Sequence, residues 1–301
     1  MCSLEDIKKK TLILTQTDPQ TDLMFKSWLN DGLSARIIFK PVKKYKRAFR
    51  RVWTYFGLPG IKIWLNNWYK ELGNYDTVIL HASEVTMHIP EVIHSINPNI
   101  RIIVWYWNLV TRGSLPQKTR DKNSEFWTFD IGDANKYGLN KNIQYYNWDK
   151  VVKSDHIKYD LYFVGRDKGR RHEIDRIVSK IKAMGFLCNI KLILSESDSI
   201  SYDKVCQDIA NSRSILEINQ RNQKGCTLRA LESLFFEKKL ITNNIYIKDV
   251  DFYNSNNIFI IGHDPWNKFK NFMKIPYNTS VNKYKKDYTI DQWLINFFKE
   301  K

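Results

Sequence analysis

Cysteine is scarce in this 301-residue sequence and follows the pattern of neither a metal site nor a disulfide framework. The four cysteines are scattered, without a CxxC pair and without paired histidines, which argues against a zinc site and a cross-linked extracellular scaffold. Long apolar runs are also missing, since none approaches the roughly 20 residues that a membrane-spanning helix needs. These absences predict a protein of the reducing cytoplasm that is neither secreted nor integral to a membrane.

Acidic residues are few compared with basic ones. Lys and Arg total 48 against 32 Asp and Glu, which leaves a formal charge of +16. This excess predicts an anionic partner: a nucleotide, a nucleic acid, a phosphorylated glycan or an anionic lipid. A nucleic acid is the least favoured of these, because the sequence holds no recognition helix, zinc spacing or aromatic-rich RNA-binding strand motif.

Strand-like and helix-like segments alternate along the chain, whose length and 43% hydrophobic content suffice for two α/β domains. We expect an N-terminal Rossmann-like domain over residues 1–145 and a C-terminal one over 158–285. The polar, irregular stretch 140–158 is the expected linker. Residues 286–301 are expected to form a helix that packs back toward the N-terminal domain. Strands are expected at 11–15, 35–39, 76–81, 100–107, 126–129, 159–164, 187–194, 214–218, 240–242 and 257–261.

The stretch 202–244 is the most informative part of the C-terminal half. Its strand 214–218 runs into the loop 219–225, which has no apolar residue and contains one glycine. Thr227 can then cap a helix whose apolar face holds Leu228, Leu231, Leu234 and Phe235, with Arg229 and Glu232 off that face. Loops of this kind gather at the carboxyl edge of a parallel sheet and favour phosphate. An ordinary βαβ unit with polar loops is the alternative.

A second basic loop follows the first strand of the C-terminal half. Four cations stand within residues 166–171, together with Gly165 and Gly169, just before an amphipathic helix. Cations, close backbone approach and a helix start together suit a diphosphate. Arg166 and Lys168 are the predicted phosphate contacts, unless this is only a solvated, basic helix start.

Three residues of the N-terminal half are candidate catalytic groups. Asp18 follows the first strand, where a substrate would lie, but it precedes Pro19 and also fits a turn or helix cap. His81 stands at the carboxyl end of a strand and is either a base facing a cleft or a structural histidine. Glu84 follows in the next loop, at the start of a helix expected over 84–96.

Residues 40–70 hold nine basic residues, eight aromatic residues and no acidic residue. Aromatic and apolar residues recur at helical spacing from Tyr45 to Phe56, the break at 57–60 follows, and a second helix is expected from Ile61 to Trp68. A basic amphipathic helix with Trp and Phe is typical of an anionic membrane surface. The residues predicted to contact the membrane or an acceptor are Lys44, Arg47, Arg50, Arg51 and Trp53. Packing of the aromatic stripe into the domain is the alternative.

The C-terminal half resembles a bacterial family of lipopolysaccharide-core and capsular-polysaccharide biosynthesis proteins. The likeness lies in the segments 159–170, 223–232, 238–244, 251–253 and 257–260, and, more loosely in the N-terminal half, in 105–108 and 129–130. It implies glycosyltransferases of the GT-B fold, with two Rossmann-like domains facing a central cleft, the donor held mainly by the second domain and the acceptor by the first. The implied donor-binding residues are Gly165, Arg166, Lys168, Gln223, Gly225, Thr227, Arg229, Glu232 and Asn244.

The resemblance leaves the stereochemistry of transfer open. Many retaining GT-B enzymes carry two glutamates separated by seven residues, of which the second binds the donor ribose. Glu232 matches the second position, but Lys224 stands at the first. We therefore expect a hexosyl- or deoxyhexosyltransferase without fixing a retaining or an inverting mechanism.

These patterns together predict a glycosyltransferase without a cofactor or a metal, because the cations of the two loops can stabilise the leaving phosphate. Its expected partners are a nucleotide sugar, a lipid-linked glycan acceptor and an anionic membrane surface, and no nucleic acid. Its expected place is the cytoplasmic face of the inner membrane, as a peripheral protein. The alternative is a non-catalytic basic protein that binds an anionic membrane or a nucleic acid.

Overall fold

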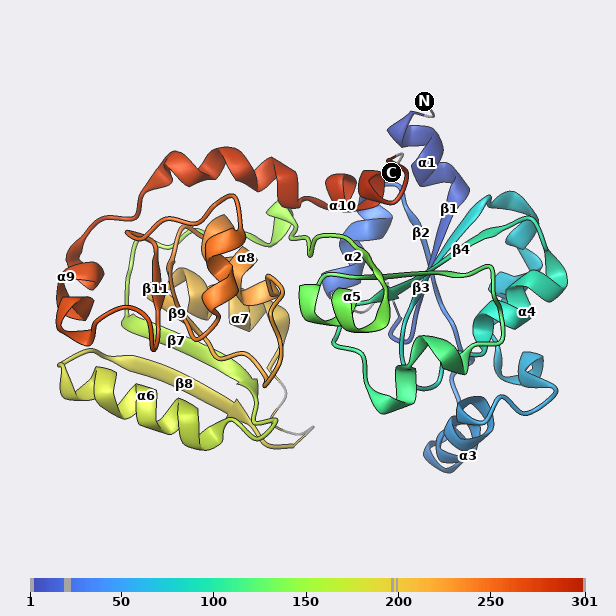
Figure 1. Cartoon of the computed structure of the whole chain (residues 1–301), viewed down its shortest axis with the longest axis horizontal. Coiled ribbons are helices and arrows are strands. Elements are labelled where there is room, and N and C mark those ends of the chain that lie inside the picture. Colours follow the sequence, from blue (N-terminus) through green and yellow to red (C-terminus); the bar gives the residue numbers. More distant parts are fainter. Residues whose placement is uncertain (1–2, 19–22, 196–197, 199, 300–301) are drawn as a thin grey trace. The chain divides into compact units, whose positions relative to one another are not determined.

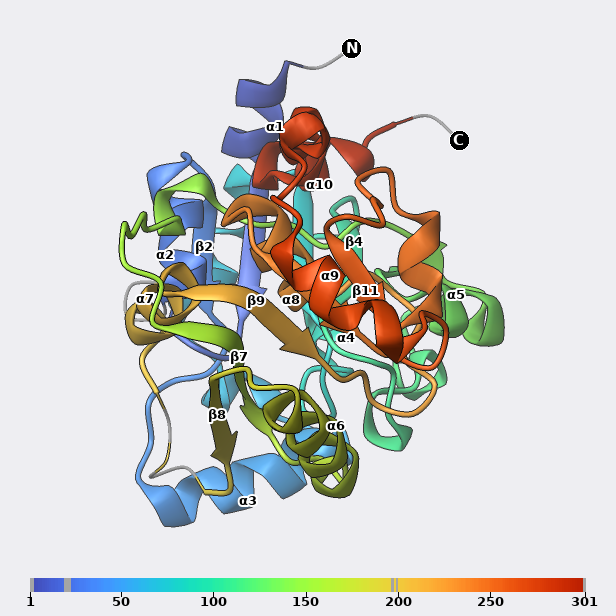
Figure 2. The same ribbon diagram turned by 90° about the vertical axis from the view of Figure 1, so that its left-hand side faces the viewer.

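The computed structural model describes residues 3–18, 23–195, 198 and 200–299 and divides into two compact units. The N-terminal unit comprises the chain up to Asn142 together with the residues from Ile295 onward. The C-terminal unit runs from Ile143 to Leu294. Each unit is a parallel sheet with helices around it (Figures 1 and 2).

The sheet of the N-terminal unit has six parallel strands in the order β2-β1-β3-β4-β5-β6. Its strands are β1 (Thr11–Thr15), β2 (Ser34–Ile37), β3 (Thr77–His81), β4 (Arg101–Tyr106), β5 (Glu125–Thr128) and β6 (Asn140–Lys141). Its helices are α1 (Leu4–Lys10), α2 (Leu23–Asn30), α3 (Lys44–Tyr55), α4 (Ile89–Ile96) and α5 (Ile131–Tyr137).

The core of this sheet follows from the alternation of side chains along its strands. One face presents an aliphatic layer that packs against α4 and the segment 61–72, and its strand residues are Leu12, Leu14, Val78, Leu80, Ile102 and Val104. The intervening residues, such as Ile79 and Ile103, are also fully buried. Burial on both faces explains why these strands read as continuous apolar runs, as is usual in parallel sheets.

The C-terminal unit has five parallel strands in the order β11-β10-β9-β7-β8. They are β7 (Tyr159–Arg166), β8 (Cys188–Ile193), β9 (Ser212–Glu217), β10 (Lys239–Thr242) and β11 (Ile258–Ile260). The helices are α6 (Arg171–Ala183), α7 (Tyr202–Ala210), α8 (Leu228–Phe235) and α9 (Phe269–Lys274), and α10 (Ile290–Asn296) closes the chain. One face packs against α7 and α8, and the other against α6 and α9 (Figure 1).

The predicted strands are confirmed, with bounds that differ by one or two residues. The helix predicted from Ile61 to Trp68 is wrong. Two short 3-10 turns replace it, Ile61–Trp64 and Asn67–Lys70. Between them the chain is extended and pairs with the residues that follow β2: Asn66 N donates to Ile38 O at 2.9 Å, and Lys40 N donates to Trp64 O at 2.9 Å.

Two helix starts also differ from expectation. The helix expected from Glu84 begins at Ile89, because Ser83 and Thr86 form a hydrogen-bonded turn and Pro90 occupies the first helical turn, where it needs no donor. Before the first strand, where no helix was expected, α1 forms with Ser3 as its N-cap, whose hydroxyl accepts from Asp6 N at 3.2 Å.

Candidate functional site

The carboxyl edge of the C-terminal sheet carries the candidate site. Strands β7 and β9 are neighbours, but the chain leaves β7 toward β8 on one side and leaves β9 toward β10 on the other. Ligands of open α/β sheets bind where the strand order reverses in this way. A pocket of about 450 Å³ lies at this point. Its lining is Lys168, Gly169, Arg170, Glu173, Asn219, Gln220, Arg221, Asn222, Gln223, Asn243, Asn244, Ile245 and Tyr246. We call it the donor pocket, after the donor-binding residues that the sequence predicts at this edge.

The donor pocket has more positive than negative charge. It is lined by Lys168, Arg170 and Arg221 against one carboxylate, Glu173. Lys168 and Arg221 are exposed and have no carboxylate within ion-pair distance among the described residues. Two cations without a counter-ion favour an anionic ligand.

Arg170 has a different role from the other two cations. Its guanidinium donates to Arg166 O at 2.7 Å, to Asp167 O at 3.2 Å and to Ile218 O. The side chain therefore ties the loop after β7 to the loop after β9. Arg170 shapes the pocket while it adds its charge.

The backbone of both loops enters the left-handed region. Lys168 has a φ of +46° and Asn222 a φ of +73°, and Gly169 beside Lys168 has a φ of +77°. Non-glycine residues in this region cost of order 1 kcal/mol or more and gather at functional sites. Both of these residues line the same pocket, so this backbone geometry supports a binding role for it.

Amide side chains fix the loops of the donor pocket. Asn243 accepts from Asn219 N at 2.8 Å and donates to Glu173 Oε1 at 3.3 Å. Asn244 donates to Lys224 O at 3.4 Å and to Gly225 O at 3.3 Å. The ends of β9 and β10 are thus joined before any ligand binds.

A buried acid is the last residue of β9. Glu217 is 2% exposed and accepts hydrogen bonds from the hydroxyls of Thr227 and Thr242. Burial raises the pKa of this carboxyl above its usual range, against the effect of the two hydroxyls. Thr227 is also the N-cap of α8, as predicted, and accepts from Arg229 N at 3.1 Å. Glu217 therefore couples the helix cap to β10.

Arg229, which is partly buried, and Glu232 form an ion pair and do not line the donor pocket. Glu232 is fully buried, receives the guanidinium of Arg229 on one oxygen, and accepts from Tyr202 Oη at 2.9 Å on the other. Arg229 also donates to Val164 O at 3.0 Å. Helix α8 is thus buried at Glu232 as well as on its apolar face. Through the hydrogen bonds of Arg229 and Glu232 the ion pair joins α8 to β7 and α7.

Of the predicted donor-binding residues, Lys168, Gln223 and Asn244 line the pocket. Gly165 and Arg166 are the last two residues of β7, and Gly225 is buried behind the loop. Sequence reasoning did not single out Arg221, Asn219, Asn243 or Glu173, which also line the pocket. The signal that could have found Asn243 is its place directly after a strand that neighbours β9.

The catalytic candidates of the N-terminal unit lie at the carboxyl edge of its sheet. Asp18 is exposed and follows β1, and His81 ends the neighbouring β3. Glu84 lies in the loop after β3 and forms an ion pair with Arg51. The strand order also reverses between β1 and β3, so this edge is the equivalent position in the N-terminal sheet.

His81 lies among aromatic rings. Its imidazole stacks on Trp107 with ring centroids 5.8 Å apart, and Phe25 and Trp28 meet it edge-on. Burial lowers the pKa of His81 to about 3, and Nε2 has no hydrogen-bond partner among the described residues. A neutral imidazole is therefore expected at neutral pH, with little strength as a general base.

Helix α3 exposes its apolar stripe. Tyr45, Phe49, Val52 and Phe56 are 66%, 55%, 54% and 62% exposed, and Lys44, Lys46, Arg47 and Arg51 stand around them. We call this set of side chains the α3 surface; the helix lies at the outside of the N-terminal unit in both views (Figures 1 and 2). Packing of the whole stripe into the domain is therefore wrong, although its fifth aromatic or apolar member, Trp53, does pack on Trp64. Among the described helices, none is long and apolar enough to cross a membrane.

Two of the predicted membrane contacts instead hold α3 in place. Trp53 packs on Phe49 and Trp64, and its indole donates to Pro59 O at 3.1 Å. Arg50 lies over the ring of Phe39 and donates to Lys40 O at 2.7 Å. These contacts fix the helix by one side and leave its stripe open.

The sequence contains an Asp-x-Asp triplet, Asp249-Val250-Asp251, whose two carboxylates are potential metal ligands. Both aspartates are exposed in a turn after β10. Within the described part of the chain, no three His, Cys, Asp or Glu side chains gather as a metal site. Metal independence stays a prediction.

Solved structures with a similar fold are found, although no protein-family model and no curated protein matches the sequence. Sucrose-phosphate synthase from Thermosynechococcus elongatus has a TM-score of 0.61 at 8% identity, over 96% of this chain and 97% of that one. HepE from Anabaena in complex with UDP and glucose has a TM-score of 0.53 at 8% identity, over 96% and 98%. The chain has the GT-B fold, with two Rossmann-like units.

Proposed function

We propose that this protein is a glycosyltransferase that moves a sugar from a nucleotide-sugar donor to a lipid-linked bacterial surface glycan, of the lipopolysaccharide core, O-antigen or capsule. The observation that carries the proposal is the cationic donor pocket at the strand-order reversal of the C-terminal sheet. The similar solved structures support it, because one is named a sucrose-phosphate synthase and another holds UDP and glucose.

The chemistry of transfer matches the charges of the donor pocket. The bond between the sugar's anomeric carbon and the phosphate oxygen breaks, a bond to an acceptor oxygen forms, and a nucleoside phosphate leaves with an added negative charge. Lys168 and Arg221 are unpaired cations that can stabilise that charge without a metal. The acceptor hydroxyl gives its proton to a base, for which Asp18 and Glu84 are better suited than the buried His81.

The α3 surface supports a membrane-bound acceptor. Exposed aromatic side chains beside four cations are the composition of helices that lie in an anionic membrane interface. We therefore place the protein at the cytoplasmic face of the inner membrane, as a peripheral enzyme. A non-catalytic basic protein would share this surface but has no need of the donor pocket.

Thermal unfolding with a panel of UDP, GDP, dTDP and CMP compounds tests the proposal. Occupancy at 100 times Kd stabilises the folded protein by roughly 2.7 kcal/mol, which raises Tm by several degrees. We expect one nucleotide class to stabilise the protein, equally with and without EDTA. Lys168→Gln should weaken that binding about tenfold or more, since a charge-assisted hydrogen bond is lost.

Lys182→Gln is the matched control, because Lys182 is an exposed cation of α6 outside the pocket. Equal losses in both variants would show that only the overall charge matters. The absence of a shift with every nucleotide, also in the presence of lipid, would reject the enzyme in favour of a binding protein.

A further inference from the structure

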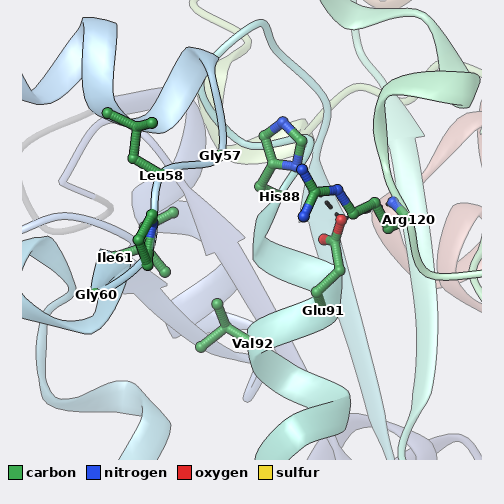
Figure 3. Close-up of a pocket in the computed structure, with 9 residues that line it drawn as sticks. Gly57, Leu58, Gly60, Ile61, His88, Glu91, Val92 and Arg120 are labelled. Atoms are coloured by element: carbon green, nitrogen blue, oxygen red, sulfur yellow. Dashed lines mark hydrogen bonds and ion pairs between the residues drawn. The ribbon is translucent and has the colours of Figure 1, made fainter.

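The N-terminal unit contains a second pocket, of about 170 Å³, beside the C-terminal end of α3. One wall is the segment Gly57–Ile61, and the facing wall is the start of α4 with Arg120 (Figure 3). Leu58 and Ile61 supply apolar surface on the first wall, and on the facing wall Val92 adds apolar surface next to His88, Glu91 and Arg120, which lie together (Figure 3). The pocket thus has an apolar half and a polar half.

The carboxylate of Glu91 is only half satisfied. Its Oε1 accepts from Arg120 N at 2.6 Å and lies 3.3 Å from His88 Nδ1. Its Oε2 is buried and has no hydrogen-bond partner within the described residues. Burial acts to raise the pKa of Glu91, but the hydrogen bonds from His88 and Arg120 outweigh it and lower the pKa. An ionised, buried oxygen without a donor predicts a ligand that donates to it.

The turn before the pocket is built against His88. Gly57 has a φ of +59°, and a Cβ at this position would lie 2.8 Å from atoms of the His88 ring. A side chain here is therefore excluded twice, by backbone conformation and by the ring. The close contact holds the imidazole beside Glu91 and fixes the polar half of the pocket.

The ligand class follows from these groups. We infer that the pocket binds the hydroxyl-bearing headgroup of a membrane amphiphile, an inference that rests on the proposed placement of the protein at a membrane surface. A sugar or polyol hydroxyl donates to Glu91 Oε2, and the apolar wall covers carbon-bound hydrogens. Arg120 beside Glu91 opposes a cationic headgroup and can donate to ligand oxygens.

The position and size of the pocket agree with this ligand. It adjoins the exposed residues Phe56 and Leu58, which are 62% and 41% exposed and continue the apolar stripe of α3. Its volume is below the roughly 300 Å³ at which pockets for drug-sized ligands begin, so it suits a single ring or glycerol unit. An amphiphile that enters along α3 would place its headgroup there.

Saturation-transfer NMR with octyl β-glucoside below its micelle concentration tests the inference. We expect saturation of the sugar-ring protons by the wild-type protein. Glu91→Gln should weaken binding about tenfold or more, because a hydrogen bond to a charged group is lost. Glu71→Gln is the matched control, since Glu71 is a carboxylate of the same unit that pairs with Arg36 away from the pocket. Gly57→Ala should weaken binding as well, and thermal unfolding checks that each variant folds.

Two outcomes with octyl β-glucoside would overturn the inference: saturation of its alkyl protons alone, or equal binding by the Glu91 and Glu71 variants. Octyltrimethylammonium that binds as well as octyl β-glucoside, and does so through Glu91, would also overturn it. So would methyl β-glucoside that binds as well as octyl β-glucoside, because the ligand would then need no alkyl chain. Nucleotide-induced stabilisation, measured on the same samples, reports on the C-terminal unit. If no nucleotide stabilises the protein while the sugar-ring signals are intact, the proposed transferase is rejected and the ligand inferred for this pocket is not.

Discussion

The α3 surface predicts a membrane affinity that can be divided into an electrostatic and an apolar part. Replacing Lys44, Lys46 and Arg47 by Gln removes three exposed cations from around the stripe. Each cation near an anionic bilayer contributes about 1 kcal/mol, so the triple variant should lose about 3 kcal/mol, or roughly 150-fold in partitioning at low salt.

The aromatic part is smaller but resists salt. Phe49 and Phe56 are 55% and 62% exposed, so a membrane can cover about half of each ring. Full burial of a Phe side chain is worth about 1.5–3 kcal/mol. Alanine at both positions should therefore cost about 2 kcal/mol, or roughly 30-fold. Salt should weaken binding of the wild-type protein and of this double variant in parallel, because both keep their charges.

Sedimentation with vesicles of phosphatidylglycerol, and with neutral phosphatidylcholine vesicles for comparison, measures both losses. The control variant replaces Arg176, Lys180 and Lys182 of α6 by Gln, which removes the same charge from another exposed helix. If the α6 variant loses as much binding as the α3 variant, only the net charge of the protein matters. If neither α3 variant differs from the wild type, the surface has no role at membranes.

Two further predictions concern buried groups. Glu232→Gln removes the counter-ion of Arg229, whose side chain is 24% exposed and can still reach water, and should cost about 2–3 kcal/mol in the free energy of unfolding, seen as a lower urea midpoint; a change below about 1 kcal/mol would contradict a stabilising ion pair. His81 has a folded pKa of about 3, against about 6.5 when unfolded. Between these values the unfolded chain binds the extra proton, so the contribution of His81 to stability is present above about pH 6.5 and is lost as the pH falls toward 3. Between pH 7 and pH 5 the Tm of the His81→Phe variant should therefore fall less than the Tm of the wild type. An equal fall in Tm would contradict a buried, neutral imidazole.

The sheets could be predicted from sequence because their strands are buried on both faces. A strand such as β4, with Ile102, Ile103, Val104 and Trp105 all fully buried, has the continuous apolar pattern that is typical of parallel strands covered on both faces. The helix after the loop 219–225 was predictable for a local reason as well, since Thr227 caps its own helix. Local chemistry sufficed at these positions.

The misprediction at 61–68 has a non-local cause. Ile61, Trp64, Leu65 and Trp68 have helical spacing, yet Leu65 is extended and bridges to Phe39 in an antiparallel pair. The pairing partner lies 26 residues earlier in the chain. No periodicity within the segment contains that information.

The candidate site was only partly predictable, because it too depends on contacts between residues far apart in the sequence. The loops after β7 and β9 are recognisable in sequence, but Asn243 and Glu173 join the pocket through neighbouring strands and helices. The ribose contact of Glu232 stays a prediction from motif spacing, because its carboxylate is fully buried and paired with Arg229. Loss of nucleotide binding in a Glu232 variant would therefore not by itself identify a ribose contact.

The net charge of the protein becomes informative once paired and unpaired cations are separated. Lys191 and Lys204 both hold Asp208, at 2.6 and 2.7 Å, and Arg229 holds Glu232, so these charges serve the fold. Lys168 and Arg221 have no such partner in the described part of the chain. The unpaired cations of the donor pocket belong to one compact unit, and Lys44, Lys46 and Arg47 of the α3 surface belong to the other. Removing charge at one should therefore leave the anion affinity of the other unchanged, and Lys168→Gln should bind vesicles as the wild type does while the triple α3 variant keeps its nucleotide shift.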